Sequence, residues 1–357
     1  MNRISRRSFL STSIYTSGLA LSLKLSGIDR AFAQIAVSPA TAWMQNNLGL
    51  LGSRTLRQIC MPGTHDAGMS TIASGTLFSD SCNTQTQTSG ILGQMQAGSR
   101  YFDIRPVISG GQYLTGHYSD IGSGSTNTWQ GGNGQSIQSI ISDINTFTAS
   151  NGELIILNLS ADLDTDLGNG SYAPFTQVQW NTLLSILQSG ISNLFVYNAS
   201  GSSDLSTLPL NTYIGNGNAA VVVIVSPGAS GISLGSYANQ GFYPAANFPS
   251  YNVYSDTNDL NTMTSDQFSK MQAQRTNPDS VFFLLSWTLT QDSLQAAACP
   301  ITGGSSTSIL DLANTANAQL SQILPACTSQ SYPNVIYIDN IQSSLNVAAL
   351  AMQINQL

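Results

Sequence analysis

The sequence predicts an α/β protein that folds as a single (β/α)₈ barrel of the TIM type. Short, continuous apolar runs alternate with amphipathic stretches along most of the chain, a pattern typical of parallel strands covered by helices on both faces. Roughly seven or eight such units follow one another without an obvious linker in 357 residues, a length that one barrel can use. A doubly wound open sheet is the alternative, but no G-x-G-x-x-G sequence opens a first strand–helix turn.

The strands are expected where apolar residues run on without a break and turn residues follow. These segments are 57–61, 101–104, a short one ending at Leu114, 154–159, 219–225, 281–287 and 335–338. Turn pairs end several elements, among them Pro62-Gly63, Asn151-Gly152 and Pro227-Gly228.

The helices are expected where apolar residues recur at 3.6-residue spacing. These segments are 91–97, 136–150, 176–188, 265–275, 309–324 and 345–354. The clearest is 136–150, where Ile137, Ile140 and Ile144 share one face. Stretches rich in Gly, Ser and Asn, at 119–135, 198–218 and 226–262, are expected to be long connections.

The composition supports a large core and excludes one class of partner. Hydrophobic residues make up 41% of the chain, which rules out global disorder. Charged residues are only 8%, against about 25% in typical soluble domains. No Lys or Arg lies between Arg105 and Lys270, and the formal net charge is −7. Because nucleic-acid binding needs a basic stripe, we expect no nucleic-acid partner.

The N-terminus is typical of an export signal. The sequence Ser5-Arg6-Arg7-Ser8-Phe9-Leu10 resembles the twin-arginine motif, and a moderately apolar stretch leads to Ala31-Phe32-Ala33, a small-x-small cleavage site. A short membrane anchor is the alternative, but the run is too short to span a bilayer and Lys24 interrupts it. We therefore expect a signal peptide over 1–33 and one exported, monomeric domain over 34–357 without a transmembrane segment.

Four cysteines fit an oxidising compartment, and they allow three pairings. Proximity in the sequence favours Cys60–Cys82 and Cys299–Cys327, while four buried, unpaired thiols are the alternative. A zinc site is not expected, because neither C-x-x-C spacing nor additional histidines are present.

Polar residues gather where the expected strands end. His65 and Asp66 follow the first strand, Asp103 and Arg105 end the second, His117 follows the third and Asp339 follows the last. In a barrel these carboxyl ends carry the catalytic residues. In a chain with so few charges and only two histidines, this concentration predicts one polar active site.

The same segments carry a family resemblance. Pro62-Gly63-Thr64-His65-Asp66, the run 100–105 and Gly116-His117 resemble the X-region of bacterial phosphatidylinositol-specific phospholipase C. The resemblance covers about 55–160, a third of the chain, and is closest to the secreted, fungal-type branch, by the segments 115–118, 131–134 and 285–288. It implies a distorted TIM barrel and a phosphodiesterase acting on a phospholipid or another phosphodiester at a membrane surface.

The resemblance also implies a role for each polar residue. His65 would be the general base oriented by Asp339, and His117 the general acid assisted by Asp66. Arg105, held by Asp103, would bind the phosphoryl oxygens. In the animal branch calcium takes the place of this arginine, so the resemblance implies that this chain needs no metal and no cofactor.

One departure leaves the head group open. The family places basic residues at the ends of the fourth and fifth strands to hold inositol, and this chain has no Lys or Arg over 106–269. Asp162, Asp164 or Trp287 could contact sugar hydroxyls instead, but a loop or packing role is favoured for each. The substrate is therefore phosphatidylinositol or another phosphodiester with a hydroxyl beside the phosphate.

Two other functions compete with this one. A metal-dependent glycerophosphodiesterase would use the same barrel, but its His-Arg-Gly strand end and Glu-x-Asp pair do not occur. A non-catalytic lipid- or glycan-binding barrel predicts that at least one catalytic partner is lost, whereas all six are present.

Overall fold

The fold is built on a curled sheet of eight parallel strands. The computed structural model describes residues 40–122, 127–199, 203–226, 231–301, 307–344 and 346–357. The sheet has the order β10-β9-β7-β3-β1-β13-β12-β11. Its strands are β1 (Met61–Thr64), β3 (Tyr101–Ile104), β7 (Leu154–Leu159), β9 (Ala220–Val225), β10 (Phe242–Pro244), β11 (Ser250–Tyr251), β12 (Phe282–Ser286) and β13 (Val335–Ile338).

This order is the chain order of a (β/α)₈ barrel, read from β1 in both directions. Every neighbouring pair is parallel, which confirms the predicted parallel sheet. The edge strands β10 and β11 are consecutive in the chain, yet no ladder joins them within the described residues. The sheet therefore has the strand sequence of a distorted TIM barrel, with one seam between its fifth and sixth strands.

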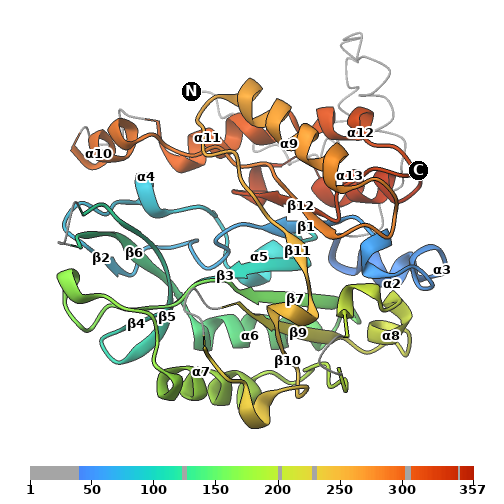
Figure 1. Cartoon of the computed structure of the whole chain (residues 1–357), viewed down its shortest axis with the longest axis horizontal. Helices are drawn as coiled ribbons and strands as arrows, with labels where there is room; N and C mark the ends of the chain where they lie inside the picture. The colour runs from blue at the N-terminus through green and yellow to red at the C-terminus, as the bar shows by residue number, and fades with distance from the viewer. Residues whose placement is uncertain (1–39, 123–126, 200–202, 227–230, 302–306, 345) are drawn as a thin grey trace, which may run out of the picture. The chain divides into compact units, whose positions relative to one another are not determined.

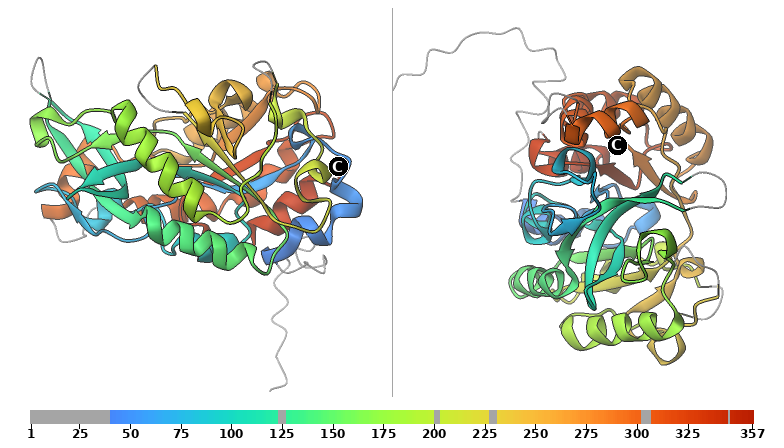
Figure 2. Two further views of the ribbon diagram at one scale, coloured as in Figure 1. Left: turned by 90° about the horizontal axis from the view of Figure 1, so that it is seen from below. Right: turned by 90° about the vertical axis from the view of Figure 1, so that its left-hand side faces the viewer.

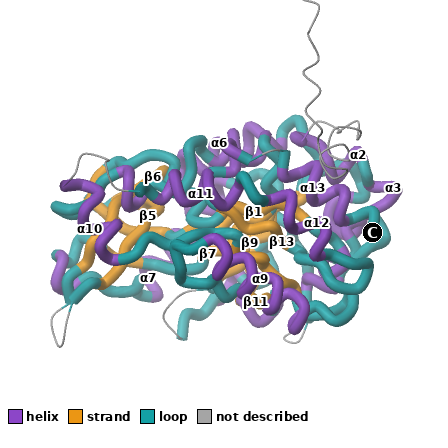
Figure 3. Tube along the Cα trace, turned by 90° about the horizontal axis from the view of Figure 1, so that it is seen from above, coloured by secondary structure: helices purple, strands orange, loops and turns teal. Residues whose placement is uncertain are grey.

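A second sheet of five strands adjoins the carboxyl ends of the first sheet. It has the order β2-β6-β5-β4-β8 and comprises β2 (Ser74–Gly75), β4 (Pro106–Ser109), β5 (Gln112–Asp120), β6 (Trp129–Ser136) and β8 (Leu163–Asp164). Only Arg105 separates β3 from β4, and three residues separate β7 from β8. Figure 3 shows the two groups of strands in orange.

The small sheet corrects two expectations. The third strand is not a barrel strand but β5, and the glycine-rich stretch expected as a connection contains β6. In β6, glycine permits close strand approach instead of forming a loop. A Cβ on Gly131 would lie 2.0 Å from the carbonyl oxygen of His117. Such a strand has no apolar alternation by which the sequence could predict it.

Helices cover the parallel sheet on both sides, as Figures 1 and 2 show. The α-helices are α2 (Trp43–Asn46), α3 (Leu48–Leu51), α4 (Ser81–Thr84), α5 (Ile91–Gln96), α6 (Ile137–Thr148), α7 (Gln177–Gly190), α8 (Leu210–Ile214), α9 (Leu260–Gln274), α10 (Ser293–Ile301), α11 (Ile309–Asn317), α12 (Ile323–Ala326) and α13 (Val347–Ile354). Side chains at N-cap positions fix where several begin: Ser136 for α6, Thr176 for α7 and Asp259 for α9.

One expected helix is divided. The segment 309–324 forms α11 and then, after a 3₁₀ turn, the short α12. The first part ends at Asn317, with Ala318 as its C-cap, and the 3₁₀ turn Leu320–Gln322 separates it from α12. None of the described helices is both long and apolar enough to cross a membrane.

The core forms two layers, one on each face of the parallel sheet. Along β7, Leu154 and Ile156 belong to the cluster with Tyr101 and Tyr337. The alternate residues Ile155 and Leu157 pack with the side chains of α6 and α7. This period of two follows from strand geometry, and it explains why β7 is apolar throughout.

The amino-terminal end of the sheet is closed by a buried ion pair between Arg100 and Glu153. Both side chains have no exposed surface, and Arg100 Nε donates to Glu153 Oε2 over 2.8 Å. Glu153 also accepts the backbone N–H groups of Met44 and Gln45. This carboxylate therefore holds α2 to the sheet, at the opposite end from the polar strand termini.

Removal of the Glu153 carboxylate is expected to destabilise the fold. Glu153→Ala leaves the Arg100 guanidinium buried without its counter-charge, and such losses cost about 3–5 kcal/mol. Urea unfolding of the purified variant measures this free energy. The double variant Arg100→Met/Glu153→Met should recover much of it, and a loss below about 1 kcal/mol in the single variant would contradict a role for the pair.

Candidate active site

A pocket of about 650 Å³ opens at the carboxyl ends of the parallel strands. Its walls are the small sheet on one side and the connection from β12 to α11 on the other. Five of the six predicted catalytic residues line the pocket. The sixth, Asp66, does not line it but contacts Arg105 and His117. The five are His65, Asp103, Arg105, His117 and Asp339.

Strand register brings His65 and Asp339 together. Thr64 of β1 pairs with Ile338 of β13, and the two functional residues follow directly on neighbouring strands. His65 Nδ1 lies 2.8 Å from Asp339 Oδ1, and the backbone N–H of His65 donates to the Ile338 carbonyl over 3.0 Å. The carboxylate thus fixes the tautomer with Nδ1–H, which leaves Nε2 as the basic nitrogen.

A buried glutamine that sequence reasoning missed ties these two strand ends together. Gln87 donates from Nε2 to the carbonyls of His65 and Ile338 over 3.0 and 3.3 Å, and its Oε1 accepts the Ile341 N–H. Its side chain is fully buried. Nothing in its sequence context distinguishes it from the other polar residues of the same loop, so no signal could have found it.

Arg105 lies at the centre of the polar cluster. Its Nε donates to Asp103 Oδ2 over 3.1 Å, and its NH1 group lies 3.3 Å from Asp66 Oδ2. The other terminal nitrogen lies 2.7 Å from His65 Nε2. Asp103 is held in turn by the hydroxyl of Ser160, which follows β7. The planar guanidinium is therefore fixed by two carboxylates and directed at the basic nitrogen.

Asp66 occupies an unusual position. Its backbone is left-handed (φ 43°) and its side chain is fully buried, with no partner for Oδ1 within the described residues. Its Oδ2 lies 3.6 Å from His117 Nδ1. A strained backbone and an unsatisfied carboxylate oxygen cost free energy, and such features concentrate at functional sites.

His117 comes from the small sheet and not from the end of a barrel strand. It lies within β5, opposite Gly132 of β6, and its Nδ1 is 3.2 Å from the carbonyl oxygen of Thr84 in α4. Its imidazole is about one-fifth exposed (22%), so it faces the pocket. A donated Nδ1–H would leave Nε2 as the atom that exchanges a proton.

The surroundings shift the pKa values of the two histidines in opposite directions. Burial lowers the pKa of His65, but the Asp339 carboxylate outweighs this effect and the net shift is upward. Burial and then the positive charge of Arg105 lower the pKa of His117 to about 4. Burial raises the pKa of Asp66 to about 7, against the opposing effect of Arg105. In the free protein at neutral pH, His117 is therefore neutral and the Asp66 carboxyl is partly protonated.

Because the chain has only two histidines, NMR can measure the pKa of each imidazole separately. In the ligand-free protein, imidazole NMR resonances should titrate as one group near pH 4 and another above the ordinary value of about 6.5. Inorganic phosphate should shift the lower pKa upward, because an anion stabilises the imidazolium. His117→Ala assigns the two curves. Two groups that titrate together near 6.5 would contradict the described environments.

Two of the proposed sugar-contacting residues fall in different places. Asp162 lines the pocket wall, where its Oδ2 accepts the N–H groups of Phe175 and of the Trp180 indole. Trp287 is wrong as a substrate contact: its side chain is 1% exposed and its Nε1 donates to the Ala316 carbonyl. Its position in an apolar run had favoured the packing alternative, which the structure shows.

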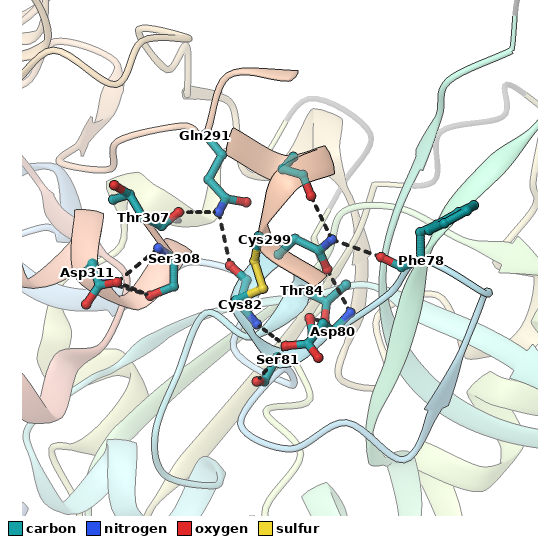
Figure 4. Close-up of a disulfide and its surroundings, with 12 residues drawn as sticks. Phe78, Asp80, Ser81, Cys82, Thr84, Gln291, Cys299, Thr307, Ser308 and Asp311 are labelled. Atoms are coloured by element: carbon teal, nitrogen blue, oxygen red, sulfur yellow. Dashed lines mark hydrogen bonds between the residues drawn. A yellow bond between two sulfur atoms is a disulfide. The ribbon is translucent and has the colours of Figure 1, made fainter. Parts of the chain in front are cut away.

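The disulfide pairing predicted from sequence proximity is also wrong. Cys82 of α4 is bonded to Cys299 of α10, 217 residues away (Figure 4). Cys60 and Cys327 are buried and free. Both bonded cysteines lie in connections above the carboxyl ends of the strands, so the fold and not the chain brings them together.

Comparison with known proteins identifies relatives in fold. No family model matches the sequence, and the search of curated proteins finds no match. Among solved structures, phosphatidylinositol-specific phospholipase C from Staphylococcus aureus is 17% identical, with a TM-score of 0.56 over 85% of this chain and 91% of that one. The enzyme from Listeria monocytogenes is 15% identical, with a TM-score of 0.53 over 88% and 99%. At these identities the likeness establishes a shared fold.

Proposed function

We propose that this protein is a phospholipase C-type phosphodiesterase that uses a hydroxyl of the substrate as its nucleophile. The observation that carries the proposal is the cluster around Arg105, where one fixed guanidinium lies beside His65 and Asp66, and Asp66 in turn lies beside His117. Phosphodiester cleavage needs a base, an acid and a cation that faces the phosphoryl oxygens, and this cluster contains all three. The shared fold with two phospholipases supports it.

The reaction exchanges one bond at phosphorus and moves two protons. His65 Nε2 removes the proton from a substrate hydroxyl beside the phosphate, and the resulting oxygen attacks phosphorus. The bond from phosphorus to the leaving oxygen breaks, and that oxygen takes a proton from the pair His117 and Asp66. The products are a cyclic phosphodiester and an alcohol. Arg105 stabilises the charge that develops on the phosphoryl oxygens.

The acid acts as a pair because its two members are coupled. In the free protein the shared proton favours Asp66, whose pKa is raised to about 7 while that of His117 is lowered to about 4. A bound phosphodiester anion favours the imidazolium: the Asp66 proton moves to His117 Nδ1, which lies 3.6 Å from Oδ2, and His117 then gives its Nε2 proton to the leaving oxygen. The two groups therefore titrate as a unit.

The proposal includes no metal and no cofactor. The Arg105 guanidinium occupies the place that a metal would need to face the phosphoryl oxygens, and within the described residues no group of three His, Cys, Asp or Glu side chains has metal-binding geometry. The alternatives are a non-catalytic lipid- or glycan-binding barrel and, after it, a metal-dependent glycerophosphodiesterase.

The head group is proposed to be hydroxylated and without further phosphates. Arg105 is the one Lys or Arg among the described residues that line the pocket. On the side next to His65 and Asp339 the pocket residues are neutral and polar, as Ser286 and Asn252 illustrate. Phosphatidylinositol or a related phospholipid meets this description.

Export is part of the proposal. The twin-arginine motif and the cleavage site near Ala33 lie outside the described residues, so they stay predictions from sequence. The disulfide between Cys82 and Cys299 supports an oxidising compartment.

A substrate panel tests the proposed function. The purified chain from Gln34 onward is incubated with phospholipids that differ only in the head group, with EDTA present, and phosphorus products are followed by ³¹P NMR. Turnover of a lipid with a vicinal hydroxyl is expected, and lipids without one should persist. Binding without turnover of any lipid would favour the non-catalytic barrel, and turnover only without EDTA would favour the glycerophosphodiesterase.

A further inference from the structure

The disulfide stands at the rim of the substrate pocket. Cys82 lies on α4 and Cys299 on α10, and each element also supplies a residue to the pocket wall, Asn83 and Ala296. Asn83 donates from Nδ2 to the Ala296 carbonyl over 3.1 Å, and Gln291 donates to the Cys82 carbonyl over 3.1 Å. Figure 4 shows the bond between Gln291 and Cys82 beside the yellow bridge. Here α4 and α10 form one joined wall.

This wall adjoins the general acid. His117 Nδ1 lies 3.2 Å from the Thr84 carbonyl, and Thr84 is the last residue of α4. The leaving oxygen must lie within hydrogen-bond reach of the acid. The rest of the leaving group therefore extends along the side of the pocket that α4 and α10 form, away from His65 and Asp339.

The wall is uncharged and carries several apolar side chains. Leu289, Ala296 and Ile309 line the pocket on this side, and no charged side chain accompanies them among the described lining residues of 289–309. Next to the bridge, Phe78 and Leu294 are also exposed, by 52% and 80%. The polar residues of this wall include Asn83 and Gln291, whose side-chain amides already donate to backbone carbonyls. An uncharged surface of this kind, with apolar side chains exposed to the pocket, suits an aliphatic alcohol.

We propose that the disulfide is a functional part of the substrate site, because it fixes α10 against α4 as the subsite that holds an apolar leaving group beside His117. The inference rests on the proposed function and extends it to the leaving group, which would be a lipid alcohol. An enzyme without the bridge keeps the catalytic cluster, because the members of that cluster come from other segments. It binds long apolar leaving groups more weakly.

The first test removes the bridge and compares two leaving groups. Cys82→Ser/Cys299→Ser is assayed on dioctanoylphosphatidylinositol below its micelle concentration and on 4-nitrophenyl inositol phosphate, which share a head group. We expect kcat/KM to fall about tenfold on the lipid, through KM, and less than about twofold on the aryl ester. Cys327→Ala, which removes a buried thiol that forms no disulfide, controls for the general cost of a cysteine substitution.

A second pair of variants keeps the bridge and so avoids any loss of folding that its removal causes. Ala296→Asp places a charge on the lining face of α10, and Ala297→Asp places the same charge on an exposed position of the same helix. The first should raise KM for the lipid alone, and the second should change neither substrate. Equal losses on both substrates, or an unchanged lipid KM in Ala296→Asp, would overturn the subsite. A wild-type protein that cleaves neither substrate would contradict the proposed function itself.

Discussion

Replacing Arg105 with alanine is expected to lower kcat on the order of 10³-fold, the size found when a cation that stabilises a phosphoryl transition state is lost. No other Lys or Arg among the described pocket residues could take its place. The variant also leaves Asp66 and Asp103 without the charge that compensates them, so local repulsion adds to the loss. Steady-state kinetics on a turned-over phospholipid measures the effect.

Two controls separate a catalytic loss from a structural one. Arg105→Lys keeps the charge but not the planar fork, and it should recover only part of the activity. Arg57→Ala removes a cation that precedes β1, at the other end of the sheet, where it pairs with Asp204, and should leave the rate unchanged. Wild-type activity should also survive millimolar EDTA. A chelator-sensitive wild type, or near-normal turnover in Arg105→Ala, would contradict the assignment of the guanidinium to the phosphoryl oxygens.

Loss of either histidine is the second large effect, and the leaving group should distinguish the two. His65 must deprotonate the attacking hydroxyl whatever group departs, so His65→Ala should be severe on every substrate. His117 matters only when the departing oxygen is a poor leaving group. His117→Ala should therefore cost on the order of 10²–10⁴-fold on a phospholipid, and most of this loss should disappear on a 4-nitrophenyl phosphodiester.

Each possible result of this comparison has a different meaning for the roles of the two histidines. Equal defects of both variants on the aryl substrate would contradict the division into base and acid. Rescue of His65→Ala instead of His117→Ala would reverse the two roles. Thermal unfolding of both variants shows whether the fold is intact, and activity like that of the wild type in either one would favour a non-catalytic barrel.

The sequence predicted five of the eight barrel strands, β3, β7, β9, β12 and β13, and most of the polar cluster for one physical reason. A buried parallel strand is a continuous apolar run, and the residues just beyond it are the ones that face the pocket. His65, Arg105 and Asp339 stand at such positions, so local patterns were enough to find them. The first strand was expected at 57–61, but β1 is Met61–Thr64 and contains the expected Pro62-Gly63 turn. The stretch 226–262, expected as a connection, contains β10 and β11.

What the sequence did not predict depends on packing between distant segments. The strand β6 is built of glycine and polar residues, and close approach to β5 instead of apolar alternation makes it a strand. The disulfide joins two connections 217 residues apart, so proximity in the chain misled the pairing. The Gln87 side chain donates hydrogen bonds to the backbone carbonyls of His65 and Ile338, and no sequence pattern predicts a bond between a side chain and a distant carbonyl.

Trp287 shows the limit of reasoning from strand ends. It follows β12 directly, where a pocket residue is expected, yet its ring turns away and packs beside Phe268. The backbone at a strand end allows a side chain to face either the pocket or the helices, and only the register with β13 decides which.

The central claim, that a hydroxyl of the substrate and not water attacks phosphorus, is tested most directly by the first phosphorus product. The wild-type protein is mixed with phosphatidylinositol in H₂¹⁸O, and ³¹P NMR spectra and product masses are recorded from the first turnovers onward. The mechanism predicts that a cyclic phosphodiester without ¹⁸O appears first and that any monoester follows it. A monoester that carries ¹⁸O from the first turnovers, with no cyclic species before it, would contradict the mechanism.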